Sequence, residues 1–232
     1  MEVRVKILGS GLVASAFKRN FRSDKPVCVF ARGVSNSSET LPAAFAREAE
    51  MLNASLADSP FLLYFSSCAL IGPNTQDSPY FAHKRQMEAA VLAASPHNRV
   101  LRLPQVVGST FNPNTLPNFL FDRISREEPF TVWSLAERNL IDADDIAKIT
   151  SALVGDAPAE RTITVAAARS LSMPDIVKLF ERVLQKRAHF TLEHRGTPLP
   201  VNNDLCLRVA ARLGIDLGET YPERVIRKYY GR

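Results

Sequence analysis

The segment Ser78-Pro79-Tyr80-Phe81-Ala82-His83-Lys84 contains two side chains that can take part in proton transfer. Tyr80 and Lys84 are four residues apart, so on a helix they lie on the same face, one turn from each other. A tyrosine normally loses its proton at about pH 10, and a nearby ammonium group lowers this pKa because it favours the phenolate. We therefore expect Lys84 to lower the pKa of Tyr80, which lets Tyr80 act as an acid or a base near neutral pH.

The YxxxK pattern also occurs by chance in lysine-rich helices, so its meaning depends on the residues before it. Residues 61–65 form a continuous apolar run, which is typical of a central parallel strand buried on both faces. Ser66 and Ser67 follow this strand, and open α/β sheets bind their ligands at the carboxyl ends of strands. Ser67 is therefore a candidate partner of Tyr80.

A glycine turn follows the first expected strand, residues 3–8. Gly9, Gly11 and Ala14 match the pattern GxGxxA, and a helical stretch to about Phe21 comes next. In this pattern the first glycine permits the tight turn, the second lets the backbone approach a pyrophosphate, and the small third residue packs the helix on the strand. The helix N-terminus then holds the anion. The turn predicts dinucleotide binding, and the alternative is a tight strand–helix turn without a ligand.

Two interpretations of the second expected strand, residues 26–30, stay open. In an ordinary dinucleotide-binding fold, Arg32 just after this strand favours the 2′-phosphate of NADP. In the other interpretation two strand–helix units have been lost, so this strand is the fourth of the usual order and residues 31–35 line the nicotinamide side. Each crossover takes about 30 residues, and one helix, 43–57, separates this strand from the strand 61–65. This spacing favours the interpretation in which two strand–helix units have been lost.

The rest of the chain continues the alternation of strands and helices. We expect strands at 99–104, at 130–133 and from 162, an edge strand at 187–193, and helices from Ser78 or Pro79 to 92, at 119–124, 176–184, 204–213 and 221–230. A loop is expected at 73–77, and residues 110–118 are too rich in Pro and Asn for regular structure before Pro117. Asp142, Asp144 and Asp145 lie where a further helix opens, and we expect them to cap it rather than to catalyse a reaction.

The composition is that of an ordinary globular protein of 232 residues, with 46% hydrophobic and 23% charged residues. No run approaches the ~18 apolar residues of a membrane helix, and residues 1–6 have no signal-peptide core, which predicts a soluble cytoplasmic protein. Cys28, Cys68 and Cys206 lack metal-binding spacing and the four histidines are scattered, so we expect neither a disulfide nor a metal. The net charge of +5 is spread along the chain, which favours anionic small molecules over nucleic acid.

Taken together, these segments resemble the extended short-chain dehydrogenase/reductase family, and within it the NAD-dependent sugar-nucleotide epimerases, dehydratases and reductases. The resemblance is carried by Gly9/Gly11/Ala14, Ser66-Ser67 through Gly72, Ser78-Pro79-Tyr80 with Lys84, Leu101-Arg102-Leu103-Pro104 through Gly108, and Arg138 through Asp145. It implies an α/β fold with an abbreviated, Rossmann-like, doubly wound parallel sheet. Residues 1–108 are expected to form the dinucleotide-binding core, with 138–155 packing back onto it. Residues 109–137 and 156–232 are expected to form a small α/β substrate lobe.

The resemblance also implies a role for each matched residue. Ser67 hydrogen-bonds the reacting oxygen, Tyr80 is the acid or base, and Lys84 holds the nicotinamide ribose of NAD or NADP. The cofactor is expected to contact Gly9, Gly11, Leu12, Val13, Ala31, Arg32, Gly33, Ser66, Tyr80, Lys84, Pro104 and Val106. The sugar nucleotide is expected to contact Asn36, Ser67, Cys68, Gln105, Asn112, Asn114 and Arg138. The helix with Tyr80 and the helix before it form a dimer interface in many members, which implies a possible homodimer.

The chain departs from the family in several places. The family's glycine turn usually has one more residue between its first two glycines, Asp142 stands where a histidine is often found, and the segment that recognises the adenosine ribose is missing, which leaves NAD or NADP open. Ser67-Cys68-Ala69 lacks the added acid and base of a dehydratase. The resemblance thus predicts an NAD(P)-dependent epimerase or 4-keto reductase for nucleotide-linked sugars, in polysaccharide or glycan precursor synthesis. The alternatives are a non-catalytic dinucleotide-binding or regulatory protein and a structural subunit that pairs with an active homologue.

Overall fold

The computed structural model describes residues 5–72 and 78–231, so the loop expected at 73–77 lies outside the described residues. Its elements in chain order are β1 (Val5–Leu8), α1 (Leu12–Asn20), β2 (Val27–Phe30), α2 (Pro42–Asp58), β3 (Leu62–Ser67), the 3-10 helix η1 (Cys68–Ile71), α3 (Pro79–Ala94), β4 (Arg99–Leu103), β5 (Gln105–Val107), α4 (Leu116–Ser125), β6 (Phe130–Trp133), β7 (Glu137–Arg138), β8 (Leu140–Asp142), α5 (Ala143–Asp156), β9 (Thr162–Thr164), β10 (Leu171–Ser172), α6 (Met173–Leu184), β11 (Phe190–Glu193), α7 (Asp204–Arg212) and α8 (Tyr221–Tyr230).

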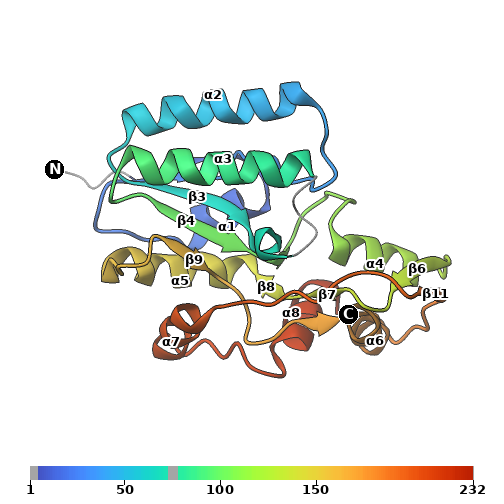
Figure 1. Ribbon diagram of the computed structural model, residues 1–232. Helices are drawn as coiled ribbons and strands as arrows, with labels where there is room; N and C mark the ends of the chain where they lie inside the picture. Colours follow the sequence, from blue (N-terminus) through green and yellow to red (C-terminus); the bar gives the residue numbers. More distant parts are fainter. Residues whose placement is uncertain (1–4, 73–77, 232) are drawn as a thin grey trace.

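Five parallel strands form the central sheet, in the order β1-β2-β3-β4-β9 (Figure 1). This confirms the predicted α/β fold with a parallel sheet. β1 lies at the edge of the sheet and β4 pairs with β3 and β9, whereas in an ordinary dinucleotide-binding sheet, of order 3-2-1-4-5-6, the first strand is central and pairs with the fourth. The order is the one expected if two strand–helix units are missing. Arg32 therefore does not follow the strand that normally recognises the adenosine ribose.

Helices cover both faces of the sheet (Figure 1). α1 and α5 pack together on the face that carries Val29 and Leu63, while α2 and α3 pack on the face that carries Phe30 and Tyr64. The steps from β1 to β2 and from β2 to β3 run in one direction across the sheet, yet α1 and α2 lie on opposite faces. The β1–α1–β2 crossover therefore has the opposite hand from the two that follow it. Such crossovers are right-handed in about 98% of cases, so this exception marks the place where the two units are missing.

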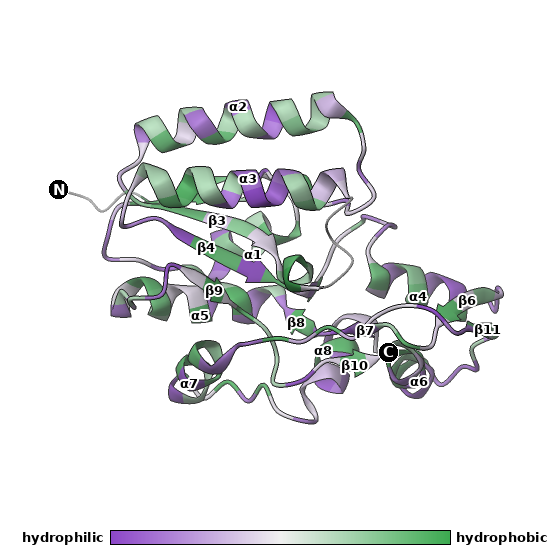
Figure 2. Ribbon diagram, in the orientation of Figure 1, coloured by the Kyte–Doolittle hydropathy of each residue, from purple (hydrophilic) through white to green (hydrophobic). Residues whose placement is uncertain are grey.

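The middle of α3 is hydrophilic although it faces the core (Figure 2). His83 and Lys84 are both buried there, together with Glu88 one turn further on. Glu88 forms two hydrogen bonds with Arg102 of β4, at 2.6 and 2.9 Å. Buried charges are tolerated when they are paired and hydrogen-bonded, so the polar residues of α3 require specific partners on the elements beneath them.

The C-terminal part of the chain adds three short strand pairs and the helices α6, α7 and α8. β11 pairs in parallel with β6, which confirms the expected edge strand near residues 187–193. Ser172 caps α6 by accepting a hydrogen bond from the Asp175 backbone at 3.2 Å. The buried face of α8 joins the same hydrophobic core as α1 and α5. None of the helices in the described ranges combines the length and the apolar composition that a membrane span needs.

Aspartates at the start of α5 anchor α8. Asp142 caps α5 by accepting a hydrogen bond from the Asp144 backbone at 2.8 Å, which confirms the capping prediction for Asp142, while Asp144 and Asp145 lie in the first turn of the helix. Lys228 of α8 lies 2.7 Å from Asp142 Oδ2 and 3.0 Å from Asp144 Oδ2. Tyr221, fully buried, donates to Asp145 Oδ2 at 2.9 Å and accepts from the Asp142 backbone at 3.0 Å. These carboxylates are thus occupied by structural contacts.

Candidate functional site

The glycine turn lies between β1 and α1, at the carboxyl end of the sheet. Gly9 has φ +129°, and a Cβ at this position would lie 2.3 Å from the Ala31 carbonyl oxygen, so glycine is required here. A Cβ at Gly11 would meet no atom within 4 Å. Gly11 is the N-cap of α1, which has no capping side chain and no acidic residue in its first turn. The backbone N–H groups of this helix end are available to an anion.

The loops that follow three neighbouring strands meet beside this turn. Ala31 follows β2, Ser67 ends β3 and Pro104 follows β4, and the carboxyl ends of parallel strands lie at one edge of a sheet. The predicted cofactor contacts Leu12, Val13, Gly33 and Val106 belong to the same edge. Gly108 packs closely on α1, because a Cβ there would lie 2.5 Å from Leu12 Cδ1. The structure thus brings the predicted cofactor segments together.

Three residues at the end of β3 differ in how available their side chains are. Ser67 caps η1 by accepting a hydrogen bond from the Ala69 backbone at 3.2 Å, which leaves its own O–H to donate. Ser66 Oγ is buried and has no hydrogen-bond partner within the described residues. Cys68 is fully buried, its thiol donates to the Arg102 carbonyl at 3.3 Å, and burial raises its pKa to about 12. The Cys68 side chain therefore does not reach the surface where a substrate is predicted to bind.

Tyr80 lies in the first turn of α3 and is 6% exposed. Burial, and secondarily the negative charge of Glu48, raise the pKa of Tyr80 to about 12. The prediction that Lys84 lowers this pKa is wrong, because the ammonium group of Lys84 is engaged elsewhere. Lys84 Nζ lies 5.8 Å from the centre of the Tyr80 ring, and in the described part of the chain no hydrogen bond joins Tyr80 to Ser67 or Lys84.

The partners of Lys84 are Glu48 and Tyr64. Lys84 Nζ lies 3.1 Å from Glu48 Oε1 and 3.0 Å from the Tyr64 hydroxyl, which itself donates to Glu48 Oε1 at 2.7 Å. Glu48, Tyr64 and Lys84 are at most 2% exposed. Burial disfavours the charged form of each ion. It lowers the pKa of Lys84, whereas Lys84 and the hydrogen bonds from Tyr64 and Val34 outweigh burial at Glu48 and lower its pKa.

The second carboxylate oxygen of Glu48 ties this cluster to the loop after β2. Glu48 Oε2 accepts a hydrogen bond from the Val34 backbone at 2.6 Å and lies 3.1 Å from His83 Nε2, which is not aligned for a hydrogen bond. Gly33 covers the pair, since a Cβ there would lie 2.8 Å from Lys84 Nζ and 2.9 Å from Glu48 Oε1. The loop of residues 31–35 is therefore held in place by its contacts with a buried ion pair.

Glu48 and Tyr64 were not among the predicted site residues, although the sequence contains a signal for each of them. Phe45, Ala49, Leu52 and Leu56 define the apolar face of α2, and Glu48 lies on that face as a lone charge. Tyr64 is the polar exception in an apolar strand, and a buried tyrosine hydroxyl usually has a hydrogen-bond partner. A single charged residue on an apolar helix face, followed by a central strand that contains a tyrosine, is the sequence pattern that indicates such a buried polar cluster.

The predicted substrate residues lie on separate segments: the loop after β2, strand β5, the segment before α4, and strand β7. Asn36, Asn112 and Asn114 are exposed, and the first two accept hydrogen bonds from backbone groups two residues later. Gln105 is half-buried in β5. Arg138 is half-buried in β7, donates to the Glu137 carbonyl at 2.7 Å, and has its pKa lowered by burial. In the described part of the chain, no hydrogen bond or ion pair joins these residues to Tyr80.

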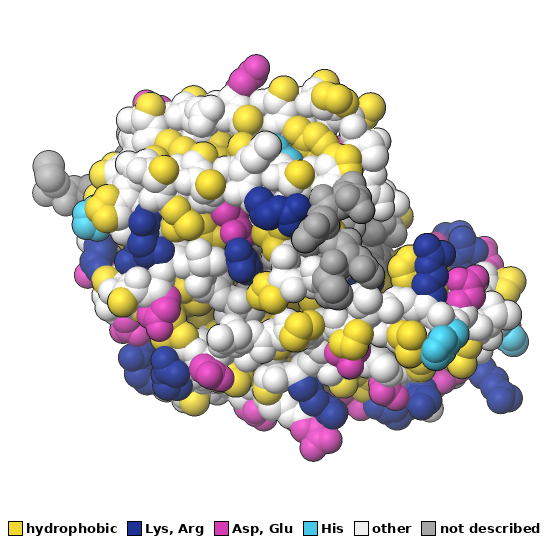
Figure 3. Space-filling model, in the orientation of Figure 1, with side chains coloured by type: hydrophobic (Ala, Val, Ile, Leu, Met, Phe, Trp, Pro, Cys, Tyr) yellow, Lys and Arg dark blue, Asp and Glu magenta, His cyan; other side chains and the backbone are white. Residues whose placement is uncertain are grey.

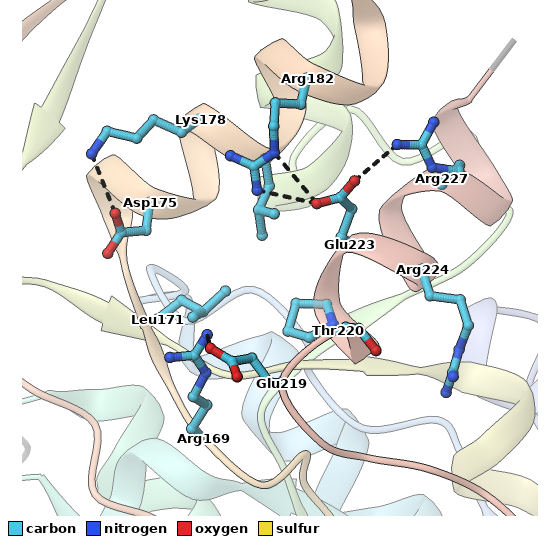
Figure 4. A pocket seen from close by; sticks show the side chains of 12 residues that line it. Arg169, Leu171, Asp175, Lys178, Arg182, Glu219, Thr220, Glu223, Arg224 and Arg227 are labelled. Carbon is cyan, nitrogen blue, oxygen red and sulfur yellow. Dashed lines mark hydrogen bonds and ion pairs between the residues drawn. The ribbon is translucent and has the colours of Figure 1, made fainter.

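A groove of about 810 Å³ lies apart from these residues, between α6 and α8 (Figure 4). Its carboxylates are already paired with neighbouring cations: Asp175 with Lys178, Glu219 with Arg169, and Glu223 with Arg182 and Arg227. It contains no residue that the sequence predicted for the site. Among residues 5–72 and 78–231, no group of three or more His, Cys, Asp or Glu side chains is placed to hold a metal ion.

The parallel sheet and its glycine turn define a Rossmann-like α/β protein. The profile of the NAD dependent epimerase/dehydratase family matches residues 3–166, so this chain belongs to that family. No curated protein sequence matches the chain.

Several solved structures share the fold. RMD from Pseudomonas aeruginosa, complexed with NADPH, has a TM-score of 0.70 at 15% identity, over 97% of each chain. UDP-glucuronic acid 4-epimerase from Bacillus cereus, in complex with UDP-glucuronic acid and NAD, has a TM-score of 0.68 at 16% identity, over 97% of this chain and 78% of that one. UDP-glucose 4-epimerase from Thermus thermophilus, in complex with NAD, has a TM-score of 0.67 at 14% identity, over 94% of this chain and 80% of that one.

Proposed function

We propose that this protein is an NAD(P)-dependent epimerase or 4-keto reductase that acts on a nucleotide-linked sugar, in the synthesis of a polysaccharide or glycan precursor. One observation carries the proposal. The glycine turn, Ser67 and the segment with Tyr80 and Lys84 all lie along the edge of the parallel sheet at which its strands end. The similar structures named above were determined with NAD or NADPH, and one of them also holds a sugar nucleotide.

The residues at the glycine turn fit a nicotinamide dinucleotide. The uncapped N-terminus of α1 offers N–H groups to the pyrophosphate, and the open space at Gly11 lets it approach. Ser66 Oγ offers an unused hydrogen-bonding group. When bound, the nicotinamide supplies the hydride transfer that side chains cannot perform. Because the described part of the chain contains no counterpart of the strand that usually recognises the adenosine ribose, the proposal includes both NAD and NADP.

The side chains of this chain position the substrate and move its proton. Ser67 donates a hydrogen bond to the reacting oxygen, and Tyr80 exchanges the proton of the same oxygen. Lys84 contacts the nicotinamide ribose. Asn36, Gln105, Asn112, Asn114 and Arg138 are proposed to contact the sugar nucleotide. A dehydratase is a weaker candidate, because Ser67-Cys68-Ala69 contains no acid–base pair.

Two measurements test this function. Isothermal titration calorimetry with NADH and NADPH should detect binding to the wild type. Tyr80→Phe should retain that binding but lose at least about 100-fold in turnover, because general acid–base groups contribute roughly 10²–10⁴ to rates. Unchanged turnover in Tyr80→Phe would exclude Tyr80 from the chemistry.

A second candidate function is non-catalytic dinucleotide binding, in a regulatory role. It is favoured by the engagement of Lys84 with Glu48 and Tyr64, which leaves this lysine fewer donors for a cofactor. Dinucleotide binding without turnover on any of a panel of UDP-, dTDP- and GDP-sugars would support it. Failure to bind NADH, NADPH and their oxidised forms, with normal folding, would exclude both candidates.

We also propose that the protein forms a homodimer through α2 and α3. The surface over these two helices is mostly hydrophobic or uncharged, whereas charges of both signs mix over the lower half of the same face (Figure 3). Ala43, Ala46, Ala54 and Ala57 are exposed on α2 and would allow close helix contact. Sedimentation equilibrium should give twice the chain mass, and Ala54→Arg should return it to the monomer.

A further inference from the structure

The glycine turn lies at the edge of the central sheet. In the described part of the chain β1 pairs with β2 alone, and residues 9–26 between these two strands contain one element, α1. An ordinary dinucleotide-binding sheet has two mononucleotide-binding halves, with strands on both sides of the first strand. Here the other strands of the described sheet all lie on one side of β1. The sheet therefore retains one of the two halves.

The retained half carries the residues proposed for the chemistry. Ser67 ends β3, and Tyr80 and Lys84 belong to α3, which packs on β3 and β4. In an ordinary fold the adenosine ribose is recognised by a residue of the other half, about 20 residues past the glycines. This chain thus has a binding surface for the nicotinamide half of a dinucleotide. On the outer side of β1 the described residues provide no strand for the adenosine half.

The loop after β2 is packed tightly against the glycine turn. The Ala31 backbone donates a hydrogen bond to the Leu8 carbonyl at 2.8 Å, and a Cβ at Gly9 would lie 2.3 Å from the Ala31 carbonyl oxygen. At the end of β3, Ser66 Oγ is buried and has no hydrogen-bond partner within the described residues. The retained half is therefore fixed by its own contacts and keeps an unused polar group.

Lys18 adds a positive charge to the turn. It is exposed on α1, its Nζ lies 3.1 Å from the Gly9 carbonyl oxygen, and it forms no ion pair with any residue that the structure describes. The N-terminus of α1 has no capping side chain and no acidic residue in its first turn. A cation next to a free helix N-terminus favours phosphate groups. The phosphates of the cofactor thus mark the outer limit of the binding surface.

Arg32 does not replace the missing half. It follows β2, and its guanidinium lies 3.8 Å from Met51 Sδ of α2, which packs on the opposite face of the sheet from α1. In an ordinary fold the adenosine ribose lies on the other side of the first strand. Arg32 is therefore not placed to contact the 2′-phosphate of NADPH.

We propose that this protein binds its cofactor through the nicotinamide mononucleotide half and the pyrophosphate, and leaves the adenosine half in solvent. The inference rests on the proposed function and specifies which part of the cofactor determines its affinity. Binding then does not distinguish NADH from NADPH, because the 2′-phosphate belongs to the half in solvent. It also does not require adenosine, so reduced nicotinamide mononucleotide, NMNH, is a ligand of the same site.

Isothermal titration calorimetry of the full chain with NADH, NADPH, NMNH and 5′-AMP tests the inference. The Kd values of NMNH and NADPH should each lie within about tenfold of the Kd of NADH, because groups that make no contact add little affinity. AMP, which carries the other half of the dinucleotide, should bind more weakly than NMNH. NMNH should also displace NADH from the loaded protein.

Arg32→Met tests separately whether the 2′-phosphate is recognised. Because Arg32 lies in the retained half, the substitution should change the affinities for NADH and NADPH by the same factor. A contact between Arg32 and the 2′-phosphate would instead make the variant lose affinity for NADPH alone. Arg187→Met, at another exposed arginine between α6 and β11, is the matched control and should leave the affinities for NADH, NADPH and NMNH unchanged.

Four results would overturn the inference: a Kd of NADH that differs more than about tenfold from that of NMNH or NADPH, AMP that binds at least as tightly as NMNH, NMNH that does not displace NADH, or a selective loss of NADPH binding in Arg32→Met. The first three need the wild type alone, so they decide even if the variant does not fold. If NADH, NADPH and NMNH all fail to bind, the proposed function is excluded. A protein that binds NADH but not NMNH fails only the inference about the adenosine half.

Discussion

Lys84 Nζ lies 3.1 Å from Glu48 Oε1 in the core, so the lysine of the YxxxK segment has a buried anionic partner before any ligand binds. The lysine and the carboxylate come from different helices on one face of the sheet, and the Tyr64 hydroxyl of β3 contacts both. The pair links the loop after β2 to the helix that carries Tyr80.

Removing the lysine should destabilise the fold more than removing both charges. Lys84→Met leaves Glu48 buried and unpaired, which costs about 3–5 kcal/mol, while Glu48→Gln/Lys84→Met should cost less than Lys84→Met alone. The unpaired Glu48 has a raised pKa, so Lys84→Met should be relatively more stable at pH 5 than at pH 8. Urea unfolding at both pH values measures this. Lys178→Met, which breaks an exposed pair with Asp175, should change stability by less than about 1 kcal/mol.

The wild type should lose stability in acid partly through Glu48. Its pKa is lowered below 4.5 in the folded protein, so its contribution is present above the unfolded pKa and is lost as pH falls through the folded value. Between about pH 5 and pH 3 the unfolding free energy of Glu48→Gln should therefore fall less steeply than that of the wild type. Glu50→Gln should follow the wild type. Parallel curves for Glu48→Gln and the wild type would contradict this assignment.

The two glycines of the turn should respond differently to alanine. Gly9→Ala should lower stability by more than about 1 kcal/mol, because its φ is +129° and the new Cβ meets Ala31. Gly11→Ala should fold normally but weaken NADH or NADPH binding, because its Cβ occupies the space left for a pyrophosphate. Gly155→Ala, also without a clash, is the control that should leave binding unchanged. Calorimetry and thermal unfolding together separate the three cases.

Tyr221→Phe should loosen α8 from the start of α5. The variant loses a hydrogen bond to Asp145 and leaves the buried backbone N–H of Asp142 without its acceptor. We expect a loss of about 1–3 kcal/mol, measured by chemical unfolding. Tyr229→Phe removes a half-buried hydroxyl that donates to Asp142 and should cost less. Equal effects of the two substitutions would argue against the burial of Tyr221 as the cause.

The sequence was enough to predict the fold because the missing units leave a spacing that can be counted. One helix stands between β2 and β3, so these two strands were expected to be neighbours, and they are; the position of β1 at the sheet edge and of β4 beside β3 agrees with the predicted loss. The positions of Gly9, Gly11, Ser67 and Tyr80 at strand and helix ends followed from local patterns of the same kind.

The electrostatics of the site did not follow from the sequence. The i, i+4 spacing of Tyr80 and Lys84 is local, whereas Glu48 lies 36 residues before Lys84 and Tyr64 lies 20 residues before it. Which charge neutralises a buried lysine depends on how two helices and a strand pack together. A rule based on helical spacing cannot contain that information, and it therefore predicted that the pKa of Tyr80 is lowered when it is raised.

The order β1-β2-β3-β4 also has a consequence for how the chain folds. In a full dinucleotide-binding sheet the first strand is central and must wait for the fourth strand to complete its pairing. Here β2, β3 and β4 each pair with the strand synthesised just before them, so this part of the sheet can assemble in the order of translation with short loop closures. β9 is the exception, since it joins β4 only after residues 104–161 have been made, and its docking is the step we expect to be slowest.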